Sequence, residues 1–147
     1  MQKEFDRLKG ICKKSGIEQK TWSYRQHYLR YHVQKTSSIL EQIGIAYDST
    51  LTFAEIAGFR CGCCYEYPLY DLINRRRLKL REQPLLVMDR SLISPKYMNL
   101  NYDDAYDFIT KCKQRCELFD GDFVILWHNN LVVEKVQKEL YQSILSS

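Results

Sequence analysis

Polar side chains of the kinds that carry acid–base chemistry follow several predicted strands along the chain. Arg25 to His27 come at the end of an aromatic strand, Asp48 and Asp89 each follow a short apolar strand, and His128 follows a longer one. In parallel α/β sheets and barrels, ligands and catalytic groups lie at the carboxyl ends of the strands. The sequence therefore predicts a functional site to which these four positions contribute.

Six cysteines form a second candidate for chemistry. Cys61, Cys63 and Cys64 lie close together in the sequence, and Cys112 and Cys116 are spaced to share one face of a helix. Two such clusters could together bind zinc, but neither has the C-x2-C spacing of a zinc ribbon. A disulfide framework is typical of small secreted domains rather than of a chain with long amphipathic segments. Reduced, partly buried thiols are therefore the favoured interpretation, with a zinc-organised interaction module as the alternative.

The spacing of apolar side chains predicts the elements that would position these residues. Helices are predicted over residues 2–14, 36–43, 102–119 and 131–145. Strands are predicted over residues 22–25, 45–47, 85–88 and 123–127. Residues 51–81 are rich in aromatic residues, glycine and cysteine, and we expect an ordered but irregular segment with buried aromatics. Helices that alternate with strands indicate an α/β fold built on a parallel sheet.

The composition is that of one ordinary globular domain spanning residues 1–147. The net charge is only +4, acidic residues are spread throughout, and the basic run from Arg75 to Arg77 is interpreted as a solvated loop. No nucleic-acid partner is therefore expected. No stretch reaches the roughly 20 apolar residues of a membrane helix. Residues 1–11 also lack the apolar core of a secretory signal, so we expect a cytoplasmic location without membrane association.

Five segments in a fixed order resemble the polysaccharide deacetylase family, that is, carbohydrate esterase family four and its relatives. They are Tyr24–Tyr31 (the arginine motif), Gly44–Leu51 (G-x-x-Y-D-S-T-L), Gly58–Tyr65 continued by Pro68–Leu72, Pro84–Asp89, and Leu126–His128 (the final L-x-H motif). Each segment is short, and the order of all five carries the resemblance. It implies a deformed (β/α) barrel that hydrolyses N-acetyl groups of amino sugars, a reaction at a non-peptide carbon–nitrogen bond.

The resemblance also implies roles for particular residues. In the family a divalent metal, usually zinc, activates a water, an aspartate acts as base, and a later histidine protonates the departing amine. His128 matches that histidine, and Arg25 matches the arginine that orients the base aspartate. Tyr28 occupies the position whose backbone N–H stabilises the oxyanion. Asp48 lies in a segment that lines the pocket, where it would anchor His128 or a sugar hydroxyl.

Trp127 and Arg60 complete the predicted substrate-binding set, together with Tyr28 and Asp48. Trp127 would stack on a sugar ring, although core packing is an equal alternative. Arg60 belongs to the G-F-R-x-G-x-C segment of one subgroup of the family. Structural roles stay open beside the functional ones, because Arg25 can simply pair with a carboxylate and Asp48 can cap the turn that follows it.

Two departures from the family pattern concern the base and the metal. His27 stands where the arginine motif usually has proline. Only 24 residues precede Arg25, and they contain no histidine and a single aspartate, Asp6, inside a predicted helix. The family's base and metal ligands lie upstream of the arginine motif, so we expect this chain alone to bind no metal. A site rebuilt from His27, His32 and Asp48 is a weaker alternative, since the two histidines would lie about 140° apart on a helix.

The sequence thus predicts a partial, deformed (β/α) barrel of the polysaccharide deacetylase type that lacks its N-terminal strands. The predicted function is that of an incomplete deacetylase-like domain whose partner is carbohydrate, and whether the chain is an enzyme stays open. The alternative is a non-catalytic module that binds glycan or protein through the retained half. Exposed strand edges would be covered by a second copy of the chain or by a complementing chain.

Overall fold

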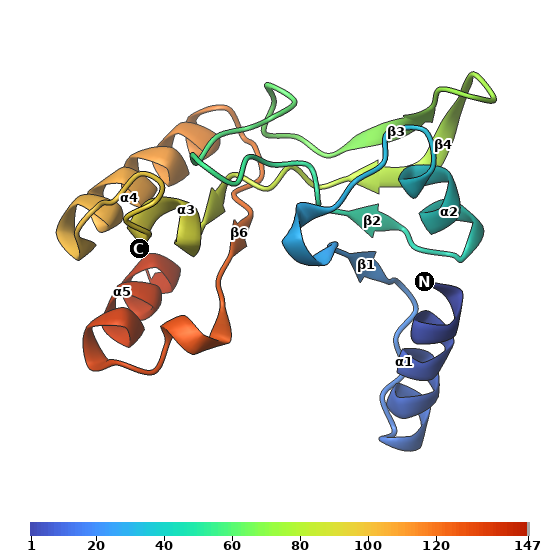
Figure 1. Ribbon diagram of the computed structural model, residues 1–147, viewed down its shortest axis with the longest axis horizontal. Coiled ribbons are helices and arrows are strands. Elements are labelled where there is room, and N and C mark those ends of the chain that lie inside the picture. Colours follow the sequence, from blue (N-terminus) through green and yellow to red (C-terminus); the bar gives the residue numbers. More distant parts are fainter. Residues whose placement is uncertain (147) are drawn as a thin grey trace. The chain divides into compact units, whose positions relative to one another are not determined.

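The computed structural model describes residues 1–146 and shows a mixed α/β protein (Figure 1). Two small sheets and five α-helices are present among these residues. The chain divides into two compact units. The first comprises residues 1–49 and 67–82, and the second comprises residues 50–66 and the residues from 83 onward. Two such units can belong to one domain, so the single domain predicted over residues 1–147 stays a prediction.

The first unit is built on a four-stranded sheet of order β1-β2-β4-β3. Its strands are β1 (Ser23–Tyr24), β2 (Tyr47–Asp48), β3 (Tyr67–Asp71) and β4 (Arg76–Glu82), and its helices are α1 (Gln2–Lys14) and α2 (Thr36–Gln42). The strands β1, β2 and β4 run parallel, whereas β3 pairs antiparallel with β4. The sheet is therefore mixed rather than parallel throughout, and it contains only the first two of the predicted strands, because the other two form a separate sheet.

The hairpin of β3 and β4 corrects the prediction of an irregular segment over residues 51–81. Along β4, Leu78 and Leu80 are buried while Arg77 and Lys79 are exposed, so side chains alternate between the two faces as a strand requires. Basic residues at the exposed positions mask this short alternation in the sequence, and the strand is missed for that reason.

The basic run also differs from the solvated loop expected of it. Arg75 lies in the turn between the two strands with a left-handed φ of 49°, and Arg76 begins β4. The Arg76 guanidinium pairs with Glu41 of α2 at 2.6 Å.

The predicted burial of aromatics over residues 51–81 is wrong for Tyr65 and Tyr70, which are 48% and 50% exposed.

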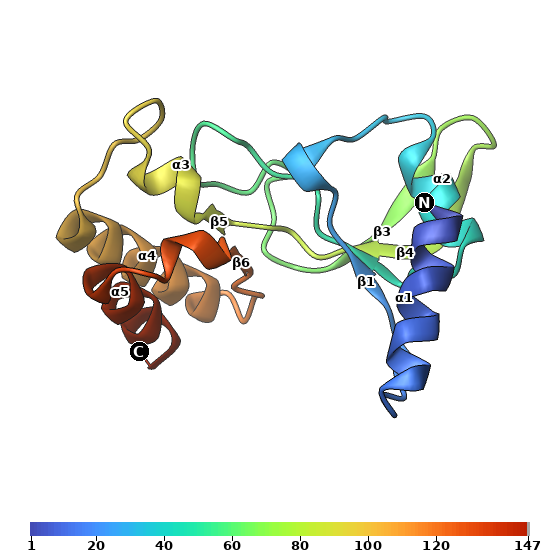
Figure 2. The same ribbon diagram turned by 60° about the horizontal axis from the view of Figure 1, so that its bottom comes forward.

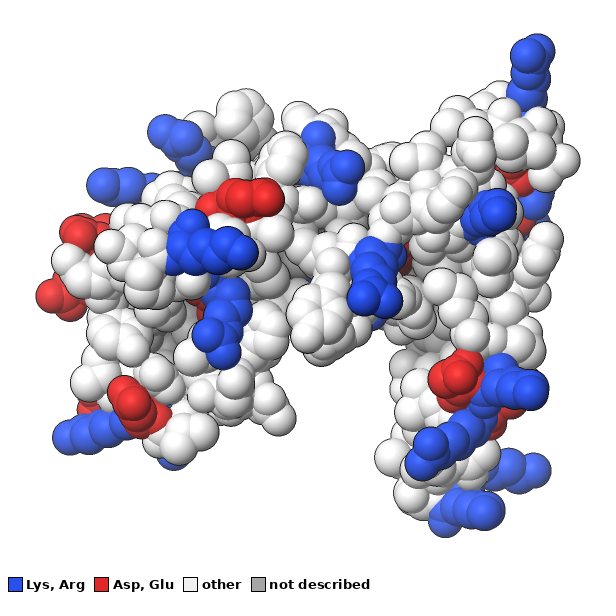
Figure 3. Space-filling view, viewed as in Figure 1, with Lys and Arg blue, Asp and Glu red and all other residues white. Residues whose placement is uncertain are grey.

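Charges of both signs lie side by side on α1. Lys9 pairs with Asp6 at 3.0 Å, and Figure 3 shows basic and acidic side chains next to one another along this helix. The buried residue of this helix is Phe5, whose ring meets that of Trp22, the residue before β1, edge to face at 5.3 Å. A mixed-charge helix of this kind is an ordinary solvated surface, because opposite charges compensate one another locally.

Asp71 closes the β3–β4 turn with both carboxylate oxygens. Its Oδ1 accepts the backbone N–H groups of Ile73 at 3.0 Å and Asn74 at 2.9 Å. Its Oδ2 accepts the Asn74 side-chain amide and the Ser38 hydroxyl, both at 2.8 Å. These hydrogen bonds, those from Asn74 first, favour the charged carboxylate and hold the pKa of Asp71 well below its usual value of 3.8.

We expect Asp71→Asn to lower the stability of the protein at pH 7 and to have a smaller effect in acid. A carboxylate whose pKa is depressed by folding stabilises the folded state fully above its unfolded pKa, and the stabilisation diminishes as the pH falls from about 4 towards the lower pKa of the folded state. Urea unfolding at pH 7 and at pH 3 measures the difference. Asp107→Asn, at an exposed position on α4, serves as the matched control. An equal effect of Asp71→Asn at both pH values would contradict the prediction.

The second unit contains a two-stranded parallel sheet, β5 (Val87–Met88) with β6 (Ile125–Leu126). Its helices are α3 (Asp89–Ile93), α4 (Tyr102–Leu118) and α5 (Lys135–Ser146). One hydrophobic cluster joins these elements, and α4 and α5 lie side by side (Figure 2). Its buried members include Leu86, Val87, Leu92, Ala105, Ile109, Leu140 and Ile144. Because both strands are anchored in this cluster, the residues at their carboxyl ends are held in place.

Three predicted elements of this unit are shorter than expected. The strand predicted over residues 85–88 is reduced to Val87–Met88. The strand predicted over residues 123–127 is reduced to Ile125–Leu126, and the closing helix starts at Lys135 because residues 129–131 form a 3-10 turn. The long helix α4 is confirmed, and Asn101 caps it by accepting the Asp104 N–H at 2.9 Å.

The sheets of residues 1–146 do not close into a barrel. The mixed α/β class is thus shown, whereas the barrel type is not confirmed. No helix within these residues has the length and apolar character needed to cross a membrane.

Candidate functional site

A histidine and an aspartate meet at the carboxyl ends of β5 and β6 in the second unit. The two strands run parallel with Met88 opposite Leu126, so the residues that follow them emerge at the same edge. Asp89 is fully buried there. The Nδ1 atom of His128 lies 2.6 Å from Asp89 Oδ1, and the His128 backbone N–H donates to Asp89 Oδ2 at 2.5 Å. Asp89 therefore holds His128 at two points, the backbone N–H and the ring nitrogen Nδ1.

This geometry assigns different tasks to the two ring nitrogens of His128. An ionised carboxylate can only accept hydrogen bonds, so an ionised Asp89 requires the ring tautomer that carries its proton on Nδ1. The Nε2 atom is left for solvent or a ligand, and the His128 side chain is 37% exposed. An imidazole oriented in this way can accept a proton at Nε2 and return it to a reacting group. The buried carboxylate stabilises the charged ring that forms in between.

The role predicted for Asp48 as the anchor of His128 is filled by Asp89 instead. Asp89 belongs to the four positions that follow predicted strands, but it is missing from the residue set drawn from the family resemblance. The signal that identifies it is its place directly after the apolar strand at residues 85–88. Asp48 keeps the alternative role of meeting a sugar hydroxyl, which stays a prediction.

Arg25, Asp48 and Glu82 gather at the carboxyl ends of the parallel strands in the first unit. Tyr24, Asp48 and Glu82 are direct neighbours across β1, β2 and β4, and both carboxyl groups are fully buried. The Arg25 Nε–H donates to the Ser49 hydroxyl at 2.8 Å and to the Ser49 carbonyl at 3.2 Å. Burial lowers the pKa of Arg25, and the charges of Asp48 and Glu82 oppose that shift.

Arg25 thus lies beside buried carboxyl groups, which is the kind of partner predicted for it. The sequence interpretation includes Asp48 among the site residues, although not as a partner of Arg25, and it overlooks Glu82, because the strand that carries Glu82 is not predicted. The alternation of Leu78, Leu80 and Glu82 along β4 is the signal that could have found it. A guanidinium beside two buried carboxyl groups can stabilise their charged forms and fix their orientation. Arg25 therefore suits the role of a positioning residue.

Tyr28, Arg60 and Trp127 lie in three different settings. Tyr28 is 80% exposed in a short 3-10 turn and has an unusual left-handed φ of 58°. Arg60 is exposed on a loop of the second unit. Trp127 is half-buried, its indole N–H donates to the Leu131 carbonyl at 3.3 Å, and its ring lies 5.4 Å from that of Tyr141. The packing alternative for Trp127 therefore has direct support.

No three histidine, cysteine or carboxylate side chains within residues 1–146 come together as a metal site. Neither the cysteine clusters nor the set of His27, His32 and Asp48 forms one. The residues present therefore do not fit the metal centre of the deacetylase family. None of the six cysteines, all of which lie within residues 1–146, is part of a disulfide. Cys64 and Cys116 are buried, whereas Cys61 is exposed.

Burial disfavours the reactive thiolate form of Cys116. Its thiol is 3% exposed, and burial first, then the neighbouring Cys64, Cys112 and Asp122, raises its pKa to about 11. Because the thiolate is the nucleophile, we expect iodoacetamide at pH 8 to modify the exposed Cys61 and to spare Cys116. Peptide mass spectrometry measures both sites, with the urea-unfolded chain as the control in which both react. Equal labelling in the folded protein would contradict this prediction.

Comparison of the chain with protein-family models, with curated proteins and with solved structures gives no match.

Proposed function

We propose that this chain carries the acid side of a polysaccharide deacetylase-like site, within a partial, deformed (β/α) barrel. The parent reaction is hydrolysis of N-acetyl groups on the amino sugars of a polysaccharide or oligosaccharide. The pairing of His128 with the buried Asp89 at 2.6 Å is the observation that carries the proposal. It gives the histidine of the L-x-H motif the partner and the orientation that a general acid needs. The order of the five resembling segments supports the same assignment.

The proposed step for His128 is the protonation of the departing amine. As the bond between the acetyl carbon and the sugar nitrogen breaks, the imidazolium gives its Nε2 proton to that nitrogen, so the amine leaves as a neutral group. Asp89 stabilises the imidazolium until the proton is transferred. In the first unit, Arg25 positions the carboxyl group of Asp48. The backbone N–H of Tyr28 is the proposed oxyanion donor, and Arg60 and Trp127 are proposed to meet the sugar.

The base and the metal ligands of the family have no counterpart among the described residues, so we derive no step through a metal. We propose that another segment or a complementing chain supplies them, and a second copy of this chain is the other candidate partner. The cytoplasmic location belongs to the same proposal. A non-catalytic glycan-binding module is the second candidate function, and the exposed ring of Tyr28 favours it, because exposed aromatic rings suit stacking on sugars.

Metal content and deacetylation of an N-acetylglucosamine oligomer, measured together on the purified chain, test the proposal. Bound zinc with turnover that a chelator abolishes would support the enzyme and would mean that a second copy of the chain completes the site. Binding of the oligomer without turnover, unchanged by chelator, would support the glycan-binding module. Absence of both binding and turnover, with and without added zinc, would overturn both candidate functions.

A further inference from the structure

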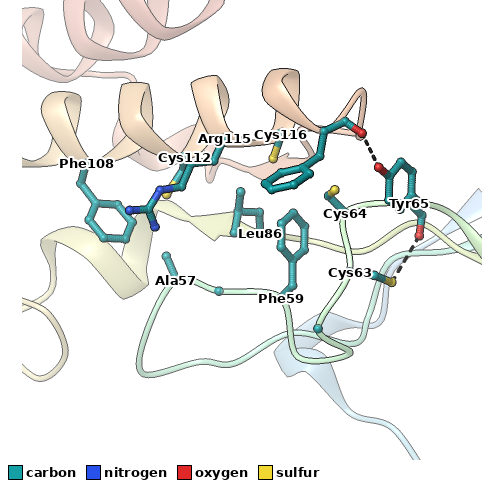
Figure 4. A pocket seen from close by; sticks show the side chains of 13 residues that line it. Ala57, Phe59, Cys63, Cys64, Tyr65, Leu86, Phe108, Cys112, Arg115 and Cys116 are labelled. Carbon is teal, nitrogen blue, oxygen red and sulfur yellow. Dashed lines mark hydrogen bonds between the residues drawn. The ribbon is translucent and has the colours of Figure 1, made fainter.

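A cavity of about 510 Å³ lies in the second unit between the loop over residues 57–65 and one face of α4 (Figure 4). Phe59 and Leu86 line it on one side, and Phe108 and Cys112 of α4 line it on the other, together with Phe119 just after the helix. The volume falls within the range of pockets that hold small organic molecules, roughly 300–1,000 Å³. Aromatic, aliphatic and thiol groups make up most of its wall, so it suits an apolar body.

Three hydrogen bonds hold the loop in place and keep this cavity formed. The Gly58 N–H donates to the Leu86 carbonyl at 2.9 Å, and the Asp122 N–H donates to the Cys64 carbonyl at 2.7 Å. The Tyr65 hydroxyl donates to the carbonyl of Phe119 at the end of α4, as Figure 4 shows. A ligand would therefore enter a preorganised pocket and would not have to order the loop first.

Arg115 is the single charged residue of the cavity wall. It is exposed at the rim, and Figure 4 shows its side chain beside Phe108. Among the described residues Arg115 makes no ion pair, and the wall contains no carboxylate. The pocket thus combines an apolar interior with one uncompensated cation whose planar fork matches a carboxylate.

We propose that this cavity binds a small organic anion with an apolar body and a single carboxylate, of which a medium-chain fatty acid is the simplest example. The apolar body lies among Phe59, Leu86 and Phe108, and the carboxylate accepts hydrogen bonds from Arg115. A cationic ligand of the same shape would face the guanidinium and is disfavoured by like-charge repulsion. This binding site is independent of the proposed deacetylase function, because it uses neither His128 nor Asp89.

Isothermal titration with decanoate, decylamine and decanol tests the proposal, because the three molecules share one body and differ in the head group. We expect decanoate to bind most tightly and decylamine most weakly. Arg115→Gln should weaken decanoate binding about tenfold and leave decanol unchanged. Lys111→Gln, one turn earlier on α4 and outside the cavity wall, is the matched control and should leave decanoate binding unchanged.

Amide chemical shifts locate the bound molecule. Decanoate should perturb residues 57–65 and the α4 residues of the cavity wall, and Ala57→Leu, which fills part of the space, should weaken all three ligands. Thermal melting shows whether Ala57→Leu is folded. If it is not, the comparison of Arg115→Gln with the unaltered protein tests the proposal without it. The proposal is overturned if decanoate does not bind, if decylamine binds as tightly, or if Arg115→Gln has no effect. Perturbation of the same residues by a neutral N-acetylglucosamine oligomer would also overturn it, since the cavity would then belong to a glycan site.

Discussion

Replacing His128 with alanine is expected to lower the rate of deacetylation of an N-acetylglucosamine oligomer by about 100-fold or more. The comparison is made in the preparation that is active, whether that is the chain alone or the chain with a complementing chain. The loss follows from the removal of the Nε2 proton donor, without which the amine must leave as a strongly basic anion. Asp89→Asn should also lower the rate, because an amide can present an N–H to Nδ1 and favour the wrong ring tautomer. Initial rates measured across pH check both variants.

Asn130→Ala is the matched control for these variants, since Asn130 is exposed on the turn that follows His128. The nitrogen chemical shifts of the His128 ring provide a readout that does not depend on turnover. We expect the neutral ring of the unaltered chain to carry its proton on Nδ1, and Asp89→Asn to shift that population. Turnover that survives His128→Ala unchanged would exclude His128 as the acid, and a ring protonated mainly on Nε2 would exclude Asp89 as its anchor.

Replacing Gly121 with alanine is expected to lower the free energy of unfolding by about 3 kcal/mol. A methyl group at this position would lie 2.8 Å from Cys64 Cβ and 3.3 Å from the Cys64 carbonyl oxygen, and closer still to the Cys64 sulfur. Neither side can move freely. The Gly121 N–H is bonded to the Cys116 carbonyl at 2.8 Å, and the next residue, Asp122, is bonded to the Cys64 carbonyl. Urea unfolding followed by circular dichroism measures the cost.

Gly10→Ala is the control for the Gly121 prediction. Gly10 lies inside α1, an alanine Cβ there would meet nothing within 4 Å, and the change should stabilise the helix by about 0.5–1 kcal/mol. In a Cys64→Ala background the sulfur is gone, so Gly121→Ala should cost less than in the unaltered chain. An unchanged stability of Gly121→Ala would show that the loop moves away from Gly121 and that the cavity wall is not rigid.

The long helix over residues 102–118 and the polar residues after the strands are predictable because each depends on neighbours in the sequence. Helical spacing of apolar residues and a capping asparagine define α4 locally. Asp48, Asp89 and His128 can be recognised as strand-end residues for the same reason. The hairpin of β3 and β4 is not predictable in this way, because its two strands pair with each other, β4 also pairs with the distant β2, and basic side chains mask the apolar alternation.

The sequence by itself determines which residue types stand at the ends of the strands, because that depends only on local spacing. The tertiary structure decides which of them act together. Asp89 meets His128 because β5 and β6 run parallel in one register, although the two residues lie 39 positions apart. Glu82 joins Arg25 and Asp48 for the corresponding reason in the other sheet. Strand pairing brings distant residues together, and no pattern within a single strand specifies its partner.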